Sequence, residues 1–212
     1  ISLDGEIAGS LNFADIAKER FSPDIDTSLL EQLGVVVSIC LSNVAAHEEL
    51  KALAFKDPLT GLLNRRAMEK ALKREFGRAK RYNTPLTLAF IDLDGFKRIN
   101  DDHGHDSGDD ILIFVASTLM DLSRDSDIAA RYAGDEFVLI LPGTDREEAG
   151  KFMDRMRAYF LGHPVMIQGN PVPVQFSFGI ASALDEDVKD TTAFIKRADV
   201  ALYQDKGRNK AR

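Results

Sequence analysis

The order of apolar segments after Pro58 is the feature that most limits the fold of this chain. Four short apolar stretches have the pattern of strands: 85–92, 127–132, 137–141 and 172–181. Amphipathic helical patterns precede, separate and follow them: 66–82, 106–122, 146–161 and 192–203. The order β-α-β-β-α-β with flanking helices predicts an α+β fold, a palm-like (ferredoxin-like) antiparallel sheet flanked by helices.

The first 28 residues are too few to bury a core alone. They contain a strand-like stretch at Glu6–Phe13 and a turn at Phe21–Asp24. This segment resembles the closing strand and last helix of a GAF-like sensor domain. We therefore interpret residues 1–28 as the C-terminal remnant of such a domain.

Residues 29–56 have a helical pattern that predicts an N-terminal stalk or linker. Apolar residues recur at alternating spacings of three and four: Leu30, Leu33, Val37, Cys40 and Val44. This seam fits an amphipathic helix packed on its own sensor domain and equally a parallel stalk between two copies of the chain. Pro58 pushes Asp57 out of the α region, so we expect the helix to end there.

Composition excludes several classes of protein. Lys and Arg number 27 against 34 Asp and Glu, and a net charge of −7 argues against a nucleic-acid partner bound by bulk charge. The single cysteine excludes an intrachain disulfide and a cysteine-based zinc site. We expect no apolar run to approach the roughly 20 residues that span a bilayer. With no basic leader at the N-terminus, we expect a cytoplasmic location and no membrane segment.

A first group of polar residues, Asp92–Lys97, follows the strand expected at 85–92. A carboxylate at a strand end can hold a hard divalent cation, and Asp92 has that position. Gly95 and Phe96 offer backbone N–H groups and Lys97 a positive charge, which together suit phosphate oxygens. The alternative is a solvated acidic turn.

A second group lies at the tip of the expected hairpin, where Asp135 and Glu136 follow Gly134. Adjacent like charges repel, and hairpin turns prefer Asn-Gly or Gly-Gly. A cation shared with Asp92 would resolve the repulsion if Asp135 lies beside Asp92 across the sheet. Gly134 would let a ligand approach the backbone closely.

These motifs together resemble the GGDEF family of diguanylate cyclases. The resemblance covers residues 57–212 and rests on six segments in the family's order: Asp57–Arg66, Asp92–Asp109, Ala133–Phe137, Phe137–Gly143, Phe176–Ala181 and Ala198–Tyr203. It implies an enzyme that condenses two GTP into cyclic di-GMP and two pyrophosphates. Because each domain holds one GTP, it also implies a homodimer with facing catalytic domains.

The resemblance assigns roles residue by residue. Asp92 and Asp135, with the Leu93 carbonyl and Glu136, would bind Mg²⁺, or Mn²⁺ in its place. The implied catalytic residues are Asp92, Lys97, Asp135 and Glu136. The implied substrate-binding residues are Gly95, Phe96 and Lys97 at the phosphates, Asn100 and Asp109 at the guanine, and Gly134 beside the nucleotide.

The chain departs from the family pattern at two places. Ala133 stands where the family usually has glycine, and its methyl group restricts positive φ. The basic motif at the C-terminus is compressed, so that Lys206 and Lys210 take the i and i+4 places, or Arg208 takes the second place if a gap is allowed. These departures leave open a second interpretation, a catalytically degenerate domain that binds GTP or cyclic di-GMP as a signalling module.

A further motif precedes the hairpin. Arg124 and Asp127 match the family's RxxD motif, and Arg155 falls where a second arginine is expected. The resemblance implies an allosteric, product-binding inhibitory site formed by these three residues. The alternative is a surface ion pair of little energetic value.

Overall fold

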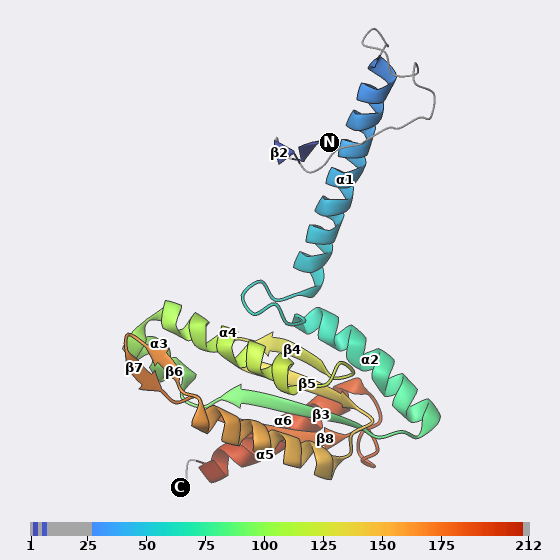
Figure 1. Cartoon of the computed structure of the whole chain (residues 1–212). Coiled ribbons are helices and arrows are strands. Elements are labelled where there is room, and N and C mark those ends of the chain that lie inside the picture. Colours follow the sequence, from blue (N-terminus) through green and yellow to red (C-terminus); the bar gives the residue numbers. More distant parts are fainter. Residues whose placement is uncertain (1, 4–5, 8–26, 210–212) are drawn as a thin grey trace. The chain divides into compact units, whose positions relative to one another are not determined.

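The computed structural model of the chain describes residues 2–3, 6–7 and 27–209 (Figure 1). Contacts between residues divide it into two units, Ile1–Ala54 and Phe55–Arg212. In the first unit, β1 (Ser2–Leu3) pairs antiparallel with β2 (Glu6–Ile7). The rest of the expected GAF-like remnant, including most of Glu6–Phe13 and the turn at 21–24, lies outside the described residues.

Helix α1 (Ser28–Phe55) has the bounds that the sequence predicts, but its apolar residues are not confined to one seam. Large apolar side chains that are between 42% and 67% exposed spread well beyond that seam: Leu29, Leu33, Val35, Val36, Ile39, Leu41 and Val44. Cys40 on the expected seam is also exposed.

The expectation that no segment approaches the length of a membrane span is wrong for this helix. Ser28–His47 is 20 residues long with a mean hydropathy of 1.7, and by length and composition it could cross a bilayer. The expectation considered runs of apolar residues, whereas the mean hydropathy of the segment also reaches that of a span when polar residues interrupt the run. A core helix of a soluble protein passes the same test, so the helix alone assigns no location.

The second unit is built on one four-stranded sheet. It consists of β3 (Leu86–Leu93), β4 (Ile128–Ala133), β5 (Glu136–Pro142) and β8 (Phe176–Ser182). The strand order is β4-β5-β3-β8, and every neighbouring pair is antiparallel. This confirms the predicted α+β, palm-like sheet.

Helices cover both faces of the sheet and bury two apolar clusters. One cluster lies under α4 (His105–Leu122) and α5 (Arg146–Gly162), and the other under α2 (Arg65–Tyr82) and α6 (Thr191–Asn209). Successive residues of the central strand β3 supply the two clusters in turn, with Ala89 and Ile91 in the first and Leu88 and Phe90 in the second. All eight residues of β3 are buried, so a polar residue at its end is held by a rigid core.

Two local features differ from the sequence prediction. Helix α3 (Phe96–His103) was not predicted, and the glycines at 95 and 104 that bound it are residues typical of turns. The strand expected at 172–181 begins only at Phe176, since Pro173 lacks the N–H group that a ladder needs. Residues before it form a separate hairpin of β6 (Val165–Ile167) and β7 (Asn170–Val172).

Helix α6 lies unusually close to strand β8 at Gly179. A Cβ atom built there would be 2.1 Å from the Ala198 carbonyl oxygen and 2.1 Å from the Leu202 nitrogen, which are backbone atoms of α6. Only glycine fits this contact. The contact sets the distance from the sheet at which α6 carries its last turns.

Candidate active site

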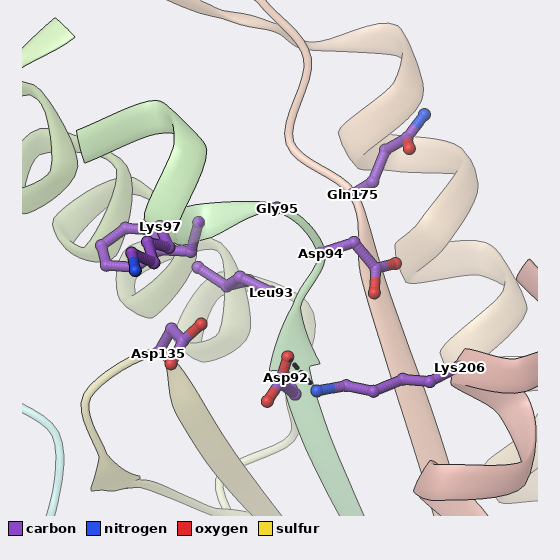
Figure 2. Close-up of a pocket in the computed structure, with 9 residues that line it drawn as sticks. Asp92, Leu93, Asp94, Gly95, Lys97, Asp135, Gln175 and Lys206 are labelled. Carbon is purple, nitrogen blue, oxygen red and sulfur yellow. Dashed lines mark ion pairs between the residues drawn. The ribbon is translucent and has the colours of Figure 1, made fainter. Parts of the chain in front are cut away.

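Acidic side chains gather where β3 ends. Asp92 is 9% exposed and lies directly opposite Glu136 of β5 in the antiparallel register, so the two side chains project from the same face of the sheet. Asp135 occupies the adjoining hairpin turn, where its carbonyl oxygen accepts the Leu93 N–H at 3.3 Å. Figure 2 shows the carboxylates of Asp92 and Asp135 on the same side of the strand end. The structure therefore brings together the acids of two motifs that are distant in the sequence.

A lysine from the last helix lies within this acidic group. Lys206 Nζ is 2.7 Å from Asp92 Oδ1 (Figure 2). The close packing of α6 on β8 at Gly179 brings the helix near enough for this pair. Lys210, the other expected basic residue, lies outside the described residues.

Three acids of the group have pKa values above their ordinary ones. Burial raises the pKa of Asp94, Asp135 and Glu136 above their ordinary values, and the nearby charge of Asp92 raises each further. Lys206 lowers the pKa of the same three groups, so its ammonium partly compensates their repulsion. The group holds more negative charge than one lysine can neutralise, which favours a bound cation.

The acids line a cavity of about 420 Å³ together with the groups expected to bind phosphate. Its lining consists of Asp92, Leu93, Asp94, Gly95, Phe96, Lys97, Asp135, Gln175 and Lys206. Gly95 has a φ of +72°, which permits the sharp turn from β3 into α3. The first N–H groups of α3 therefore lie at this cavity, as a phosphate site requires.

The donor set fits Mg²⁺. No group of three or more His, Cys, Asp or Glu side chains is arranged to hold a metal within residues 27–209. Mg²⁺ usually keeps several waters and binds through one or two carboxylates plus the phosphates of its substrate, so Asp92 and Asp135 suffice. The ammonium of Lys206 beside Asp92 already marks this place as one that attracts a cation.

Four of the expected site residues that the structure describes do not line this cavity: Glu136, Asn100, Asp109 and Gly134. Glu136 lines a neighbouring groove of about 610 Å³ between α2 and α6, although its charge still interacts with Asp92 and Asp135. Asn100 lies on α3 and Asp109 on α4, and these two helices pack against each other. Asn100 Oδ1 is buried and has no hydrogen-bond partner among the described residues, whereas Asp109 is exposed.

The hairpin that carries Asp135 is fixed by an ion pair that the sequence analysis missed. Arg131 donates to the Gly134 carbonyl at 2.9 Å and to Asp57 Oδ1 at 3.0 Å. Burial by itself raises the pKa of Asp57, but hydrogen bonds from Thr60 and Arg131 hold that pKa below its ordinary value. Asp57 begins the first motif of the family resemblance, and Arg131 lies in the strand that leads into the hairpin motif. No local pattern shows that residues 74 positions apart will pair.

Ala133, the departure from the family pattern, causes no backbone strain. Among the non-glycine residues of the described chain, only Asn83 and Gln168 have positive φ. The positive φ of this turn falls instead on Gly134, at +49°. An alanine at position 133 therefore costs the hairpin little.

Asp205, next to Lys206, was also missed by the sequence analysis. Its carboxylate pairs with Arg157 of α5 at 2.7 Å and accepts the backbone N–H of Phe178 at 3.1 Å. Through this residue, α6 is tied to both α5 and β8. The tie holds the helical turn from which Lys206 projects.

A second cavity of about 200 Å³ lies beside α5. The three residues of the expected inhibitory site, Arg124, Asp127 and Arg155, all line it. Asp127 Oδ2 accepts the Arg124 backbone N–H at 2.9 Å, so the carboxylate stabilises the loop rather than pairing with the guanidinium. The Arg155 guanidinium lies 5.6 Å from the centre of the Phe152 ring. The side chains of Arg124 and Arg155 are exposed, and both line this cavity.

Comparisons with known proteins show the family to which the chain is related. The model of the family described as "Diguanylate cyclase, GGDEF domain" matches residues 54–212. Diguanylate cyclase DgcP of Pseudomonas aeruginosa is 40% identical over 159 residues, which are 75% of this chain and 23% of that protein. Cyclic di-GMP phosphodiesterase NbdA of the same organism is 37% identical over 168 residues, which are 78% of this chain and 21% of that protein. The chain thus spans less than a quarter of the length of either relative.

A solved structure is also similar over most of the chain. It is the crystal structure of the coiled coil and GGDEF domain of DgcB from Caulobacter crescentus in complex with c-di-GMP. The TM-score is 0.75 at 27% sequence identity, and the match covers 84% of this chain and 94% of that one.

Proposed function

The chain belongs to the GGDEF family of diguanylate cyclases, and on that premise we propose that it condenses two GTP into cyclic di-GMP with release of two pyrophosphates. One observation carries the proposal most directly: a single cavity joins a buried carboxylate, the turn before α3 and a lysine. Phosphoryl transfer requires mainly positioning and neutralisation of charge, and these residue types supply both.

The residues of the cavity would have separate roles in metal binding and phosphate binding. Asp92, Asp135 and the Leu93 carbonyl would hold Mg²⁺ or Mn²⁺, with Glu136 adding charge from the adjacent groove. When bound, the ion would neutralise phosphate charge and lower the pKa of the attacking 3′-hydroxyl. The N–H groups after Gly95 would donate to the β- and γ-phosphates, and Lys97 and Lys206 would balance their charge.

The guanine base would bind away from the acids. Asn100 and Asp109 lie on packed helices adjoining the cavity, and the buried, unpartnered Asn100 Oδ1 is an acceptor that a base could satisfy. A site that pairs with the hydrogen-bonding edge of guanine rejects adenine, because its buried polar groups would then stay unpaired.

The reaction needs two copies of the chain. The described part of each copy has one such cavity, so two GTP molecules would react when two cavities face each other across a two-fold axis. A paired α1 would hold the copies together. The exposed apolar surface of α1 and the similarity to the coiled-coil-containing DgcB structure support this arrangement.

The second cavity would bind the product. Arg124, Asp127 and Arg155 could recognise the guanine edges of cyclic di-GMP outside the active site, giving allosteric feedback inhibition. The protein would act in the cytoplasm, where GTP is available. Residues 1–28 would close a GAF-like sensor domain that regulates the cyclase.

A second candidate function is a degenerate domain that binds GTP or cyclic di-GMP without turnover. Similarity to a relative named as a phosphodiesterase keeps this candidate open. The unstrained Ala133 and the assembled acids of β3 and the hairpin favour the enzyme instead.

Incubation of the purified chain with GTP and Mg²⁺ tests the two candidates. The enzyme should release cyclic di-GMP and twice as much pyrophosphate, and neither product should form in EDTA. Tight nucleotide binding without either product would instead establish the binding module.

A further inference from the structure

Gly108 occupies a helical position where glycine is a poor choice. It lies in the first half of α4 and is buried, and its φ is not in the positive range that favours glycine. At such a position alanine stabilises a helix relative to glycine. The glycine therefore has another reason to be there.

That reason is the side chain of Asn100. A Cβ atom built on Gly108 would be 1.9 Å from Asn100 Oδ1, 3.0 Å from Asn100 Cγ and 3.2 Å from Phe96 Cζ. All three are outer atoms of side chains on α3, and no backbone atom is among them. Alanine at this position would thus displace the Asn100 amide while leaving the two helices able to pack.

The displaced amide is the one with an unmet hydrogen bond. Asn100 Oδ1 is buried and without a partner among the described residues, although nearly all buried polar atoms in folded proteins are paired. The Asn100 amide lies against Gly108 of α4, and Asp109 is the next residue in the sequence. The amide of one candidate base-reading residue therefore lies against the residue that directly precedes the other.

We propose that Gly108 is a specificity-determining positioning residue. The space left by its missing side chain holds the Asn100 amide where, together with Asp109, it can meet a guanine base. This inference rests on the proposed function, since it deepens the guanine site of that function. It gives the glycine a role in choosing the base and none in the chemistry.

Two other glycines define the controls. At Gly179 a Cβ would strike the backbone of α6, so that position is a packing site. At Gly77, an exposed position within α2, a Cβ would meet nothing within 4 Å. Gly77→Ala therefore makes the same helix-favouring change without a neighbour to displace.

The test compares Gly108→Ala with Gly77→Ala for stability and for nucleotide binding. Thermal melting without nucleotide should give both variants a Tm at or above that of the parent. Calorimetric titration with the α,β-methylene analogue of GTP and Mg²⁺ should show binding about 5- to 150-fold weaker for Gly108→Ala, because a buried acceptor loses its partner. Gly77→Ala should bind as the parent does, and the adenine analogue should bind Gly108→Ala no more weakly than it binds the parent.

Asn100→Ala separates displacement of the amide from any other effect of the new methyl group. The double variant Asn100→Ala/Gly108→Ala should bind the guanine analogue as weakly as Asn100→Ala alone. If the two losses add, the methyl group acts independently of Asn100 and the inference is wrong. It is also wrong if Gly108→Ala binds like the parent, or if its Tm falls well below that of Gly77→Ala. A parent protein that binds no guanine analogue would overturn the proposed function itself, and the inference with it.

Discussion

The two cavities of the catalytic unit differ in the charge that predominates in their lining, and they are built in different ways. The cavity at the end of β3 gathers the carboxylates of Asp92, Asp94 and Asp135 on a buried strand end and its adjoining turns. The cavity beside α5 is lined by three cationic side chains of a loop and a helix, which outnumber its two carboxylates: Arg124, Lys151 and Arg155 against Asp127 and Glu148. The buried strand holds the acids close together, and their repulsion favours a bound cation. The exposed arginines favour a bound anion, and their placement does not disturb the fold. Changes in the first cavity should therefore act on chemistry, and changes in the second on regulation.

The largest expected effect tests the first half of this comparison. Asp135→Ala should reduce cyclic di-GMP synthesis below detection, since it removes one of two cation-binding carboxylates. Its Tm without metal should stay within a few degrees of the parent, because changes at partly exposed positions usually alter stability by about 0.5 kcal/mol or less. Asp154→Ala on the exposed side of α5 is the matched control. Retained turnover would remove Asp135 from the mechanism.

Arg124→Ala tests the second half. The variant should keep the initial rate of the parent but lose the slowing that accompanies product accumulation. One bidentate contact with guanine is worth roughly 1–3 kcal/mol, so product binding should weaken about 5- to 150-fold. Rates and cyclic di-GMP affinity measured beside those of Arg81→Ala, an exposed arginine of α2, check this. The comparison breaks if Arg124→Ala is inhibited at the same product concentration as the parent.

Lys206→Met sharpens the account of the first cavity, because two affinities should change in opposite directions. Without nucleotide, Mn²⁺ should bind about threefold to tenfold more tightly, since the ammonium no longer competes for Asp92. The GTP analogue should bind more weakly, since a phosphate partner is lost. Titration followed by electron paramagnetic resonance measures the first and calorimetry the second, with Lys189→Met as control. If metal and nucleotide affinities fall together, Lys206 has only a structural role.

The smallest expected effect concerns pH. The pKa of Asp135 is raised on folding, so the folded chain binds more protons than the unfolded chain between the ordinary pKa and the raised one. Protonated Asp135 therefore stabilises the folded chain at low pH. This stabilisation is lost as the pH rises through the raised pKa.

Without metal, Asp135→Asn should then have a higher Tm than the parent at neutral pH, by a few degrees at most. The difference should shrink as the pH falls below the raised pKa. A difference that is constant from pH 4 to pH 7 would show that ionisation of Asp135 does not destabilise the fold.

Local patterns predicted much of this structure, and contacts between distant segments account for what they missed. The bounds of α1 and the buried strand before Asp92 follow from spacing alone, because each depends on near neighbours in the sequence. Helix α3 was missed since its bounding glycines mimic a loop. The pairs Asp57–Arg131 and Lys206–Asp92 depend on how the sheet and helices pack, which no local spacing encodes. The membrane-span expectation failed for a different reason: it considered runs of apolar residues, whereas the mean hydropathy of Ser28–His47 is high enough for a span.

The contact at Gly179 has a consequence for how such a chain can change over generations. Strand β8 and helix α6 touch there backbone to backbone, so any larger residue must push α6 outward and carry Lys206 away from Asp92. The sequences of the two segments must therefore stay compatible with each other. A recombination breakpoint between residues 179 and 198 would be tolerated only between parents that share this glycine, whereas exchange of α5 surface residues around the second cavity would leave the spacing of β8 and α6 intact.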